Sequence, residues 1–122
     1  MASLNSVHLI GNLTAKPELR YTPKGTAVAD FSLAINRRWK DDAGKEQEAV
    51  TFVDVTAWGR LGEIADKYLG KGKPVFIGGR LHLEEWDDKT TGKRRTRLKV
   101  IAEELQLIAV KAPSDSAEPG PF

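Results

Sequence analysis

The sequence has 122 residues, of which 40% are hydrophobic and 30% are charged. It is long enough for one domain with a real core and too apolar to be disordered throughout. It contains no cysteine, which excludes disulfides, thiolate nucleophiles and thiolate metal sites. The formal net charge is +2, and residues 112–122 carry two acids and no Lys or Arg, so the remaining chain carries +4. This modest positive charge permits a polyanionic partner without requiring one.

Short apolar or alternating segments predict a chain built mainly of strands. The first strand is expected at 7–13, followed by a loop at 14–25 that contains Pro17 and Pro23. The next strands are expected at 28–36, 50–58, 74–86 and 94–101, with a last short strand around residues 105–108. The alternation predicts that Leu33 and its alternate neighbours in 28–36, and Val53 and Val55 in 50–58, face the core. The charged segment 37–48 is predicted to be a loop, and 87–93 is predicted to connect two strands of a hairpin.

One segment has the period of a helix. Its apolar residues recur at i, i+3, i+4, i+7 and i+8, and Gly70 and Gly72 end it. These residues, which include Tyr68 as an expected core residue, are Leu61, Ile64, Ala65, Tyr68 and Leu69. A single helix between the third and fourth strands favours an all-β fold of the OB type, a five-stranded Greek-key barrel with one helix at its end. We expect this domain at 1–111 and a short, mildly acidic, disordered tail at 112–122.

Large aromatic residues occupy positions where polar residues are expected. Strand 50–58 places Phe52 and Trp58 on the same face as Asp54 and Thr56, which the alternation predicts to be solvated. In strand 74–86 the core face is predicted to carry Val75, Ile77, Leu81 and Leu83, and Trp86 falls on the opposite, polar face. Trp39 lies in the charged segment. Exposed aromatic rings commonly mark a contact surface.

Many cations accompany these rings, and the combination is typical of a surface for single-stranded nucleic acid. Unpaired bases stack on aromatic rings while Lys and Arg bind the phosphates, and a duplex hides its base faces. We therefore predict base stacking at Trp39, Phe52, Trp58 and Trp86. The candidate phosphate contacts are Arg20, Arg37, Arg38, Lys40, Arg60, Lys71, Lys73, Arg80, Arg95 and Arg97.

Other interpretations of the aromatic residues remain open. Phe52 and Trp58 could be buried against the helix or a second subunit, Trp39 could fold back on its own loop, and Trp86 could be a cross-strand partner in a hairpin. The second functional hypothesis is an OB-fold module that binds RNA or acts as a primosome-type adaptor. A third is a structural protein whose aromatic residues lie in subunit contacts.

The residue patterns do not favour an enzyme. His8 and His82 are the only histidines and lie on predicted strands, without the paired spacing of a metal hydrolase. The Gly-Lys pairs lack the remaining residues of a phosphate-binding loop. We therefore expect no catalytic residues, no metal and no cofactor. The sequence has neither a signal peptide pattern nor a membrane-spanning apolar run, so we expect no membrane contact and a cytoplasmic location.

Several motifs resemble the bacterial single-stranded DNA-binding protein family over about residues 5–110. They are 5–13, Pro17-Glu18-Leu19-Arg20-Tyr21, Gly25 to Ala29, Ala57-Trp58-Gly59-Arg60-Leu61, Tyr68 to Gly72, Val75 to Leu81, and Trp39, Phe52 and Trp86. The resemblance implies an OB-fold homotetramer that wraps single-stranded DNA in replication, recombination and repair, close to the nucleoid. It also implies that the four aromatic residues are the stacking positions, although family members commonly have Trp in place of Phe52 and Phe in place of Trp58.

The end of the chain departs from the family pattern. Family members usually have a long linker with an acidic tip that docks replication and repair proteins. Here the tail is short and its acids are sparse, but a terminal Pro121-Phe122 is kept. The resemblance therefore implies partner docking through Pro121 and Phe122, weakened by the missing acids.

Overall fold

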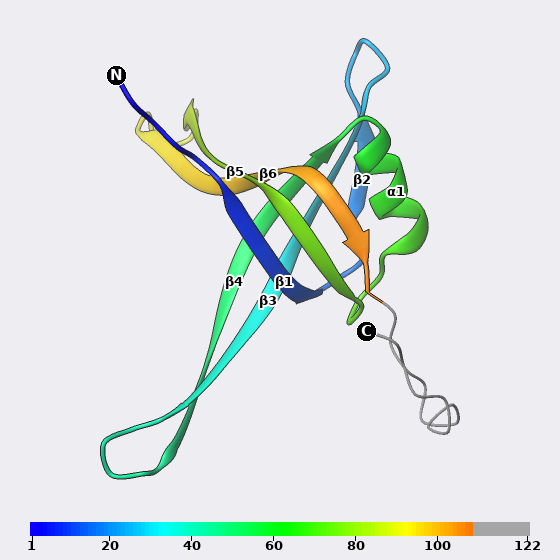
Figure 1. Ribbon diagram of the computed structural model, residues 1–122. Helices are drawn as coiled ribbons and strands as arrows, with labels where there is room; N and C mark the ends of the chain where they lie inside the picture. The colour runs from blue at the N-terminus through cyan, green and yellow to red at the C-terminus, as the bar shows by residue number, and fades with distance from the viewer. Residues whose placement is uncertain (109–122) are drawn as a thin grey trace, which may run out of the picture.

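The computed structural model describes residues 1–108. It contains six strands and one helix: β1 (Val7–Leu13), β2 (Glu18–Tyr21), β3 (Ala27–Lys40), β4 (Glu46–Trp58), α1 (Arg60–Tyr68), β5 (Pro74–Asp87) and β6 (Arg94–Leu107). Figure 1 shows these strands coiled around a common core, with α1 packed at one end. The short strand β2 forms in a segment that the sequence predicted to be a loop, because it pairs with the first residues of β3.

Five strands close into a barrel. The strand order is β1-β5-β6-β4-β3-β2, and an additional pairing between β1 and β3 closes the first five strands of this series into a ring. That closing pairing is short, since it includes only Asn12 opposite Ala34 and Leu13 opposite Leu33. The predicted all-β OB barrel, with its helix between the third and fourth barrel strands, is confirmed, and β2 is an extra strand on the edge of β3.

The core contains most of the inward-facing residues that the alternation predicted, together with residues of β6. Leu33, Val55, Val75, Ile77 and Val100 are almost completely buried, together with several alanines. Few residues of the helix are buried: Gly62 and Ala65 within α1, and Leu69 directly after it. Tyr68 was expected in the core but is 47% exposed, because only one side of this short helix touches the barrel.

A β-bulge lets the long strands β5 and β6 bend around the barrel. The pairing shifts between Gly78 and Gly79, so that Gly78 lies opposite Glu104 but Gly79 lies opposite Ala102. A Cβ atom on Gly79 would lie 2.0 Å from the carbonyl oxygen of Ile101. Glycine is therefore required at this position by the close approach of a neighbouring backbone.

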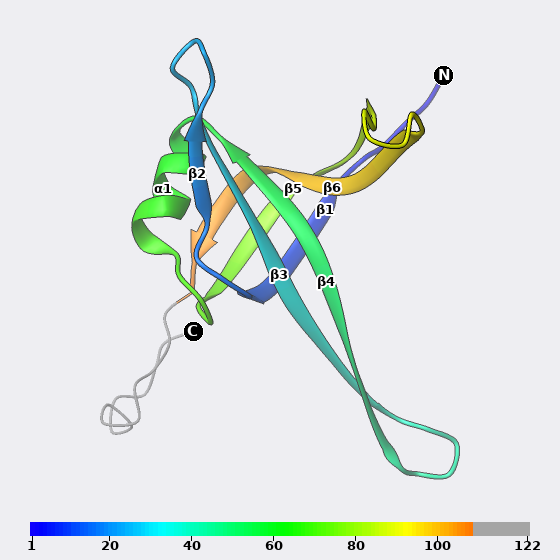
Figure 2. The same cartoon turned by 180° about the vertical axis from the view of Figure 1, so that it is seen from behind.

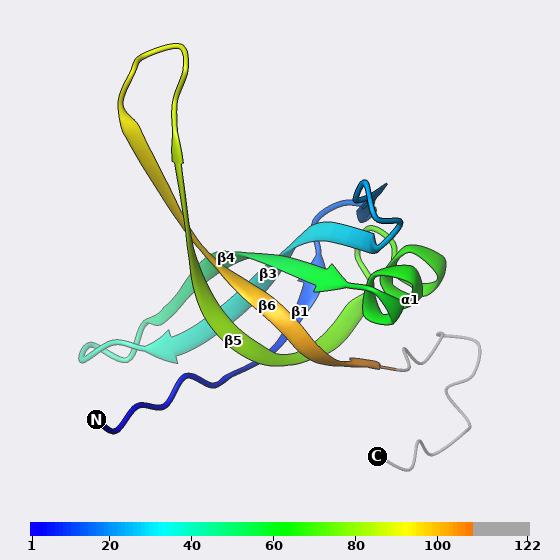
Figure 3. The same cartoon turned by 90° about the horizontal axis from the view of Figure 1, so that it is seen from above.

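Two hairpins extend beyond the barrel as arms. Strands β3 and β4 stay paired as far as Lys40 and Glu46, so most of the segment predicted as a loop is strand and only a short turn connects it. Figures 1 and 2 show this arm leaving the barrel on the side away from β2, and Figure 3 shows the β5–β6 hairpin leaving in another direction. Leu81 and Leu83 were predicted to face the core, but they are 43% and 52% exposed because β5 has already left the barrel. The last predicted short strand is the end of β6.

Residues 112–122, including Pro121 and Phe122, lie outside the described residues, so the expected domain boundary and tail remain predictions. No helix within residues 1–108 is long and apolar enough to cross a membrane.

Candidate nucleic-acid interface

Three of the four predicted stacking residues lie on one outer face of the barrel. Side chains alternate between the two sides of a strand, and residues directly opposite each other share a side. Phe52, Thr56 and Trp58 are alternate residues of β4, so their side chains lie on one side of that strand. Phe52 and Trp58 lie opposite Ala34 and Val28 of β3, and Thr56 lies opposite Ile101 of β6. Arg95 lies on the same side of β6 as Ile101, and it is directly opposite Trp86 of β5. Phe52, Trp58 and Trp86 therefore belong to a continuous surface over β3, β4, β6 and β5, which we call the outer face.

The rings on the outer face are accessible to solvent within the single chain. Phe52 is 68% exposed, Trp58 is 46% exposed and Trp86 is 44% exposed. Trp58 borders a surface hollow of about 260 Å³ together with Arg80, His82 and other residues of β5 and β6. Burial against the helix is thereby excluded for Phe52 and Trp58.

Trp39 lies on the other side of the β3–β4 arm. It lies opposite Gln47, and Gln47 and Phe52 lie on opposite sides of β4 because they are an odd number of positions apart. Its ring is 37% exposed, and the guanidinium of Arg37 lies 4.8 Å from the ring centroid, as a cation–π contact. The structure thus groups three of the predicted rings and places the fourth on the reverse of an arm.

The ten predicted phosphate contacts fall into two groups. Five form ion pairs with carboxylates of the same chain: Arg20 with Asp30, Arg38 with Glu48, Arg80 with Glu103, Arg95 with Asp88, and Arg97 with Asp54. The other five form no ion pair with an acidic side chain among residues 1–108; they are Arg37, Lys40, Arg60, Lys71 and Lys73. The second group lies on the β3–β4 arm, at the start of α1 and in the turn before β5.

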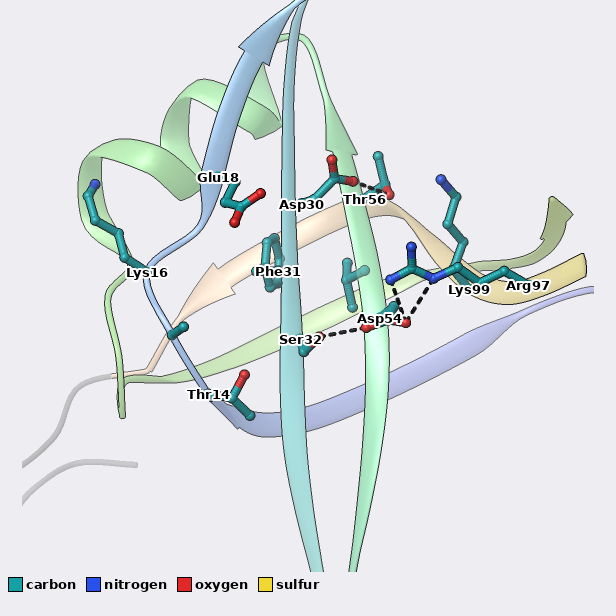
Figure 4. A pocket seen from close by; sticks show the side chains of 12 residues that line it. Thr14, Lys16, Glu18, Asp30, Phe31, Ser32, Asp54, Thr56, Arg97 and Lys99 are labelled. Carbon is teal, nitrogen blue, oxygen red and sulfur yellow. Dashed lines mark hydrogen bonds and ion pairs between the residues drawn. The ribbon is translucent and has the colours of Figure 1, made fainter. Parts of the chain in front are cut away.

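A network of polar side chains lies between Phe52 and Trp58 on the outer face (Figure 4). The Ser32 hydroxyl donates to Asp54 Oδ1 at 2.6 Å, while the Arg97 Nε and Nη2 donate to Asp54 Oδ2 at 3.0 and 2.7 Å. The Thr56 hydroxyl donates to Asp30 Oδ1 at 2.7 Å. Ser32 and Arg97 hold the pKa of Asp54 below its ordinary value, and Asp54 raises that of Arg97.

Further ion pairs extend this network. Lys99 is a buried residue, only 8% exposed. Its ammonium donates to Glu84 Oε2 at 2.8 Å and lowers the pKa of Glu84. Backbone N–H groups, above all that of Thr90, lower the pKa of Asp88. None of Asp30, Ser32, Glu84 and Lys99 was among the predicted site residues, although alternation along their strands places them on the outer face. Their pairing depends on strand register, which the alternation does not reveal. Thr56 was expected to be solvated, but it is 2% exposed because Asp30 and the neighbouring strands cover it.

Within the described part of the chain, no three His, Asp or Glu residues come together as a metal site. His8 is exposed on β1 and His82 borders the hollow beside Trp58.

A family model described as "Single-strand binding protein family" matches residues 4–108. The single-stranded DNA-binding proteins of Wolinella succinogenes and Helicobacter hepaticus are both 46% identical; the matches cover 95% and 91% of this chain, and 71% and 65% of those proteins.

Two solved structures share the fold. The single-stranded DNA-binding protein from Thermus aquaticus, in a deletion mutant, superposes with a TM-score of 0.77 at 37% identity, covering 87% of this chain and 51% of that one. The Plasmodium falciparum SSB complex with ssDNA superposes with a TM-score of 0.79 at 26% identity, covering 89% of this chain and 98% of that one. The match of the family model along nearly the whole described chain shows that this chain belongs to the single-strand binding protein family.

Proposed function

We propose that this chain binds and protects single-stranded DNA during replication, recombination and repair, with little preference for sequence. Its family and its relatives, which are single-stranded DNA-binding proteins, support this function. The observation that carries the mechanism is the exposure of Phe52, Trp58 and Trp86 on one outer face. Every base has a flat π surface, so stacking on these rings does not depend on base identity.

The phosphates are bound by cations on the β3–β4 arm and in the turn before β5. Arg37 and Lys40 on the β3–β4 arm, and Lys71 and Lys73 in the turn before β5, have no competing ion pair among residues 1–108. Trp39 lies beside Arg37 on the reverse of the arm, so a strand that passes around the arm reaches a fourth ring. The five predicted cations that form ion pairs contact DNA only if phosphate displaces their carboxylate partners.

Titration with oligonucleotides tests this function. The chain has three tryptophans, all among the proposed stacking residues, so oligo(dT) should quench their fluorescence. Binding to oligo(dT) should be tighter than to a duplex and should weaken with added salt, because counterions compete for the phosphates. A marked preference for oligo(U) would instead favour the RNA-binding alternative, and unchanged fluorescence would contradict stacking.

We also propose that the chain assembles with copies of itself, as the family resemblance implies for a homotetramer. Strand β1 is paired with β5 along one edge but meets β3 only at Asn12 and Leu13, so its other edge is open from Val7 to Ile10 among the described residues. An open strand edge is a template for pairing with another chain. Ile10 beside this edge is 60% exposed. Light scattering should give a mass several times that of one chain, and Ile10→Asp should lower it.

Two further proposals rest on the resemblance. Pro121 and Phe122 dock replication and repair proteins, so deleting Phe122 should weaken partner binding and spare DNA binding. Equal loss of both would contradict this separation. The chain acts as a binding protein and not as an enzyme, in the bacterial cytoplasm close to the nucleoid where single-stranded DNA forms.

A further inference from the structure

The ion pair between Asp54 and Arg97 lies where the two arms separate. Backbone pairing between β4 and β6 begins at Val55 opposite Val100 and continues only to Ala57 opposite Ala102. Asp54 precedes this pairing on β4 and Arg97 precedes it on β6. Figure 4 shows the two side chains bridging the strands at this point. The ion pair is also on the outer face, between the proposed stacking residues Phe52 and Trp58.

Asp54 occupies the guanidinium of Arg97 in the manner that a phosphate would. Nε and Nη2 both donate to Asp54 Oδ2, at 3.0 and 2.7 Å. Both hydrogen bonds are charge-assisted, and they occupy two neighbouring N–H groups of the guanidinium. The Ser32 hydroxyl, at 2.6 Å from Oδ1, fixes the carboxylate from the other side. Asp54 therefore has fixed partners on both of its oxygen atoms.

The neighbouring cations are neutralised in the same way. Arg20 Nε lies 3.2 Å from Asp30 Oδ2, and Lys99 Nζ lies 2.8 Å from Glu84 Oε2. The strip between Phe52 and Trp58 thus contains cations but has little net charge. Cations without a carboxylate partner among residues 1–108 lie outside this strip, such as Lys40 at the end of β3 and Lys71 in the turn before β5. We call these positions the rim.

We propose that Asp54 withholds Arg97 from the DNA backbone, so that the central strip meets bases while the phosphates bind to cations at the rim. This inference rests on the proposed function and adds a residue that determines how the strand is oriented. A phosphate that displaced Asp54 would release its own counterion, but the freed carboxylate would attract a cation in its place. The exchange would therefore give almost no gain in affinity from counterion release.

The substitution Asp54→Asn tests the proposal, because Asn keeps the size of the side chain and removes its charge. With Arg97 available to one more phosphate, the plot of log affinity for oligo(dT) against log salt should become steeper by about 0.7. Relative to wild type, the affinity of the variant should then gain about eightfold between 1 M and 0.05 M salt. Glu63→Gln, which removes one exposed acid from α1, is the control for net charge and should leave the slope unchanged.

Substitution of Arg97 supplies the second arm of the experiment. Arg97→Gln alone should leave the salt slope at its wild-type value, since Arg97 does not neutralise a phosphate while Asp54 holds it. In the Asp54→Asn background the same substitution should abolish the added slope. Thermal unfolding of each variant shows whether it is folded, and Arg97→Gln tests the proposal even if Asp54→Asn does not fold.

Two results would overturn the inference. One is a loss of about 0.7 in slope for Arg97→Gln alone, which would show that Arg97 already binds a phosphate. The other is weaker binding by folded Asp54→Asn at every salt concentration, which would show that Asp54 positions Arg97 for DNA. Both leave the proposed function intact, whereas failure of the wild-type chain to bind oligo(dT) would refute the function itself.

Discussion

At the scale of single residues, Phe52 is the most exposed of the proposed stacking residues. Phe52→Ala should weaken oligo(dT) binding by roughly 1–3 kcal/mol, or about 5- to 150-fold in affinity, because the truncated side chain no longer stacks on a base. Tyr68→Ala is the control, since Tyr68 is a half-exposed ring on α1, outside the outer face. Fluorescence titration measures both, and an equal loss in the two variants would argue against a specific stacking role.

Thr56 contributes to stability through its buried hydroxyl. Thr56→Val keeps the shape but removes the hydrogen bond to Asp30 Oδ1, so the free energy of unfolding should fall by about 1.5–3 kcal/mol, as for hydrogen bonds to charged groups. Thr51→Val, at an exposed position of the same strand, should change it by less than about 0.5 kcal/mol. Urea unfolding measures both values. Equal stability of the two variants would show that the hydrogen bond from Thr56 to Asp30 contributes little to the free energy of unfolding.

At the scale of elements, the bulge between β5 and β6 depends on Gly79. Gly79→Ala would force a methyl group against the Ile101 carbonyl oxygen and should destabilise the fold by roughly 1–3 kcal/mol or more. Gly70→Ala is the control, because a Cβ atom there has no neighbour within 4 Å. Denaturant unfolding should separate the two variants clearly. A neutral Gly79→Ala would mean that β6 shifts easily past this position.

Alternation along single strands predicts more of the fold than of the site. It identifies Leu33, Val55 and Ile77 as core residues and places Phe52 and Trp58 on the outer face, since facing depends on parity alone. It does not show how far a hairpin continues beyond the barrel, so segment 37–48 was misread as a loop and Leu81 and Leu83 as core. The ion pairs were also missed, because Asp54 and Arg97 are brought together only by the pairing of β4 with β6.

At the scale of the whole molecule, stability should depend on pH through carboxylates with lowered pKa values. Hydrogen bonds lower the pKa of Asp41, first from the Lys45 backbone N–H, and likewise those of Asp54, Glu84 and Asp88. Such groups bind fewer protons in the folded state, so their stabilisation is complete above the unfolded-chain values of 3.8 for Asp and 4.5 for Glu. It is lost as the pH falls below these values and through the lower pKa values of the folded state.

Urea unfolding between pH 7 and pH 3 checks this expectation. These groups should leave the free energy of unfolding nearly constant from pH 7 to about pH 5 and lower it steeply below about pH 4.5. Asp54→Asn should show a smaller acid loss than wild type, because it lacks one of the titrating groups. An identical acid loss in the two proteins would contradict the assigned role of Asp54.

The two arms have a consequence for motion. From Asn36 to Lys40 on β3, and from Leu81 to Leu83 on β5, the side chains are exposed, so each arm is held mainly by the hydrogen bonds between its own two strands. Segments with little packing open locally at lower free energy than a core does. Amide hydrogens of both arms should therefore exchange with deuterium well before those of Leu33, Val55 or Ile77 in the free protein. A bound DNA strand that lies across both arms should slow amide exchange in both of them, while amide exchange at the centre of the barrel stays as slow as before.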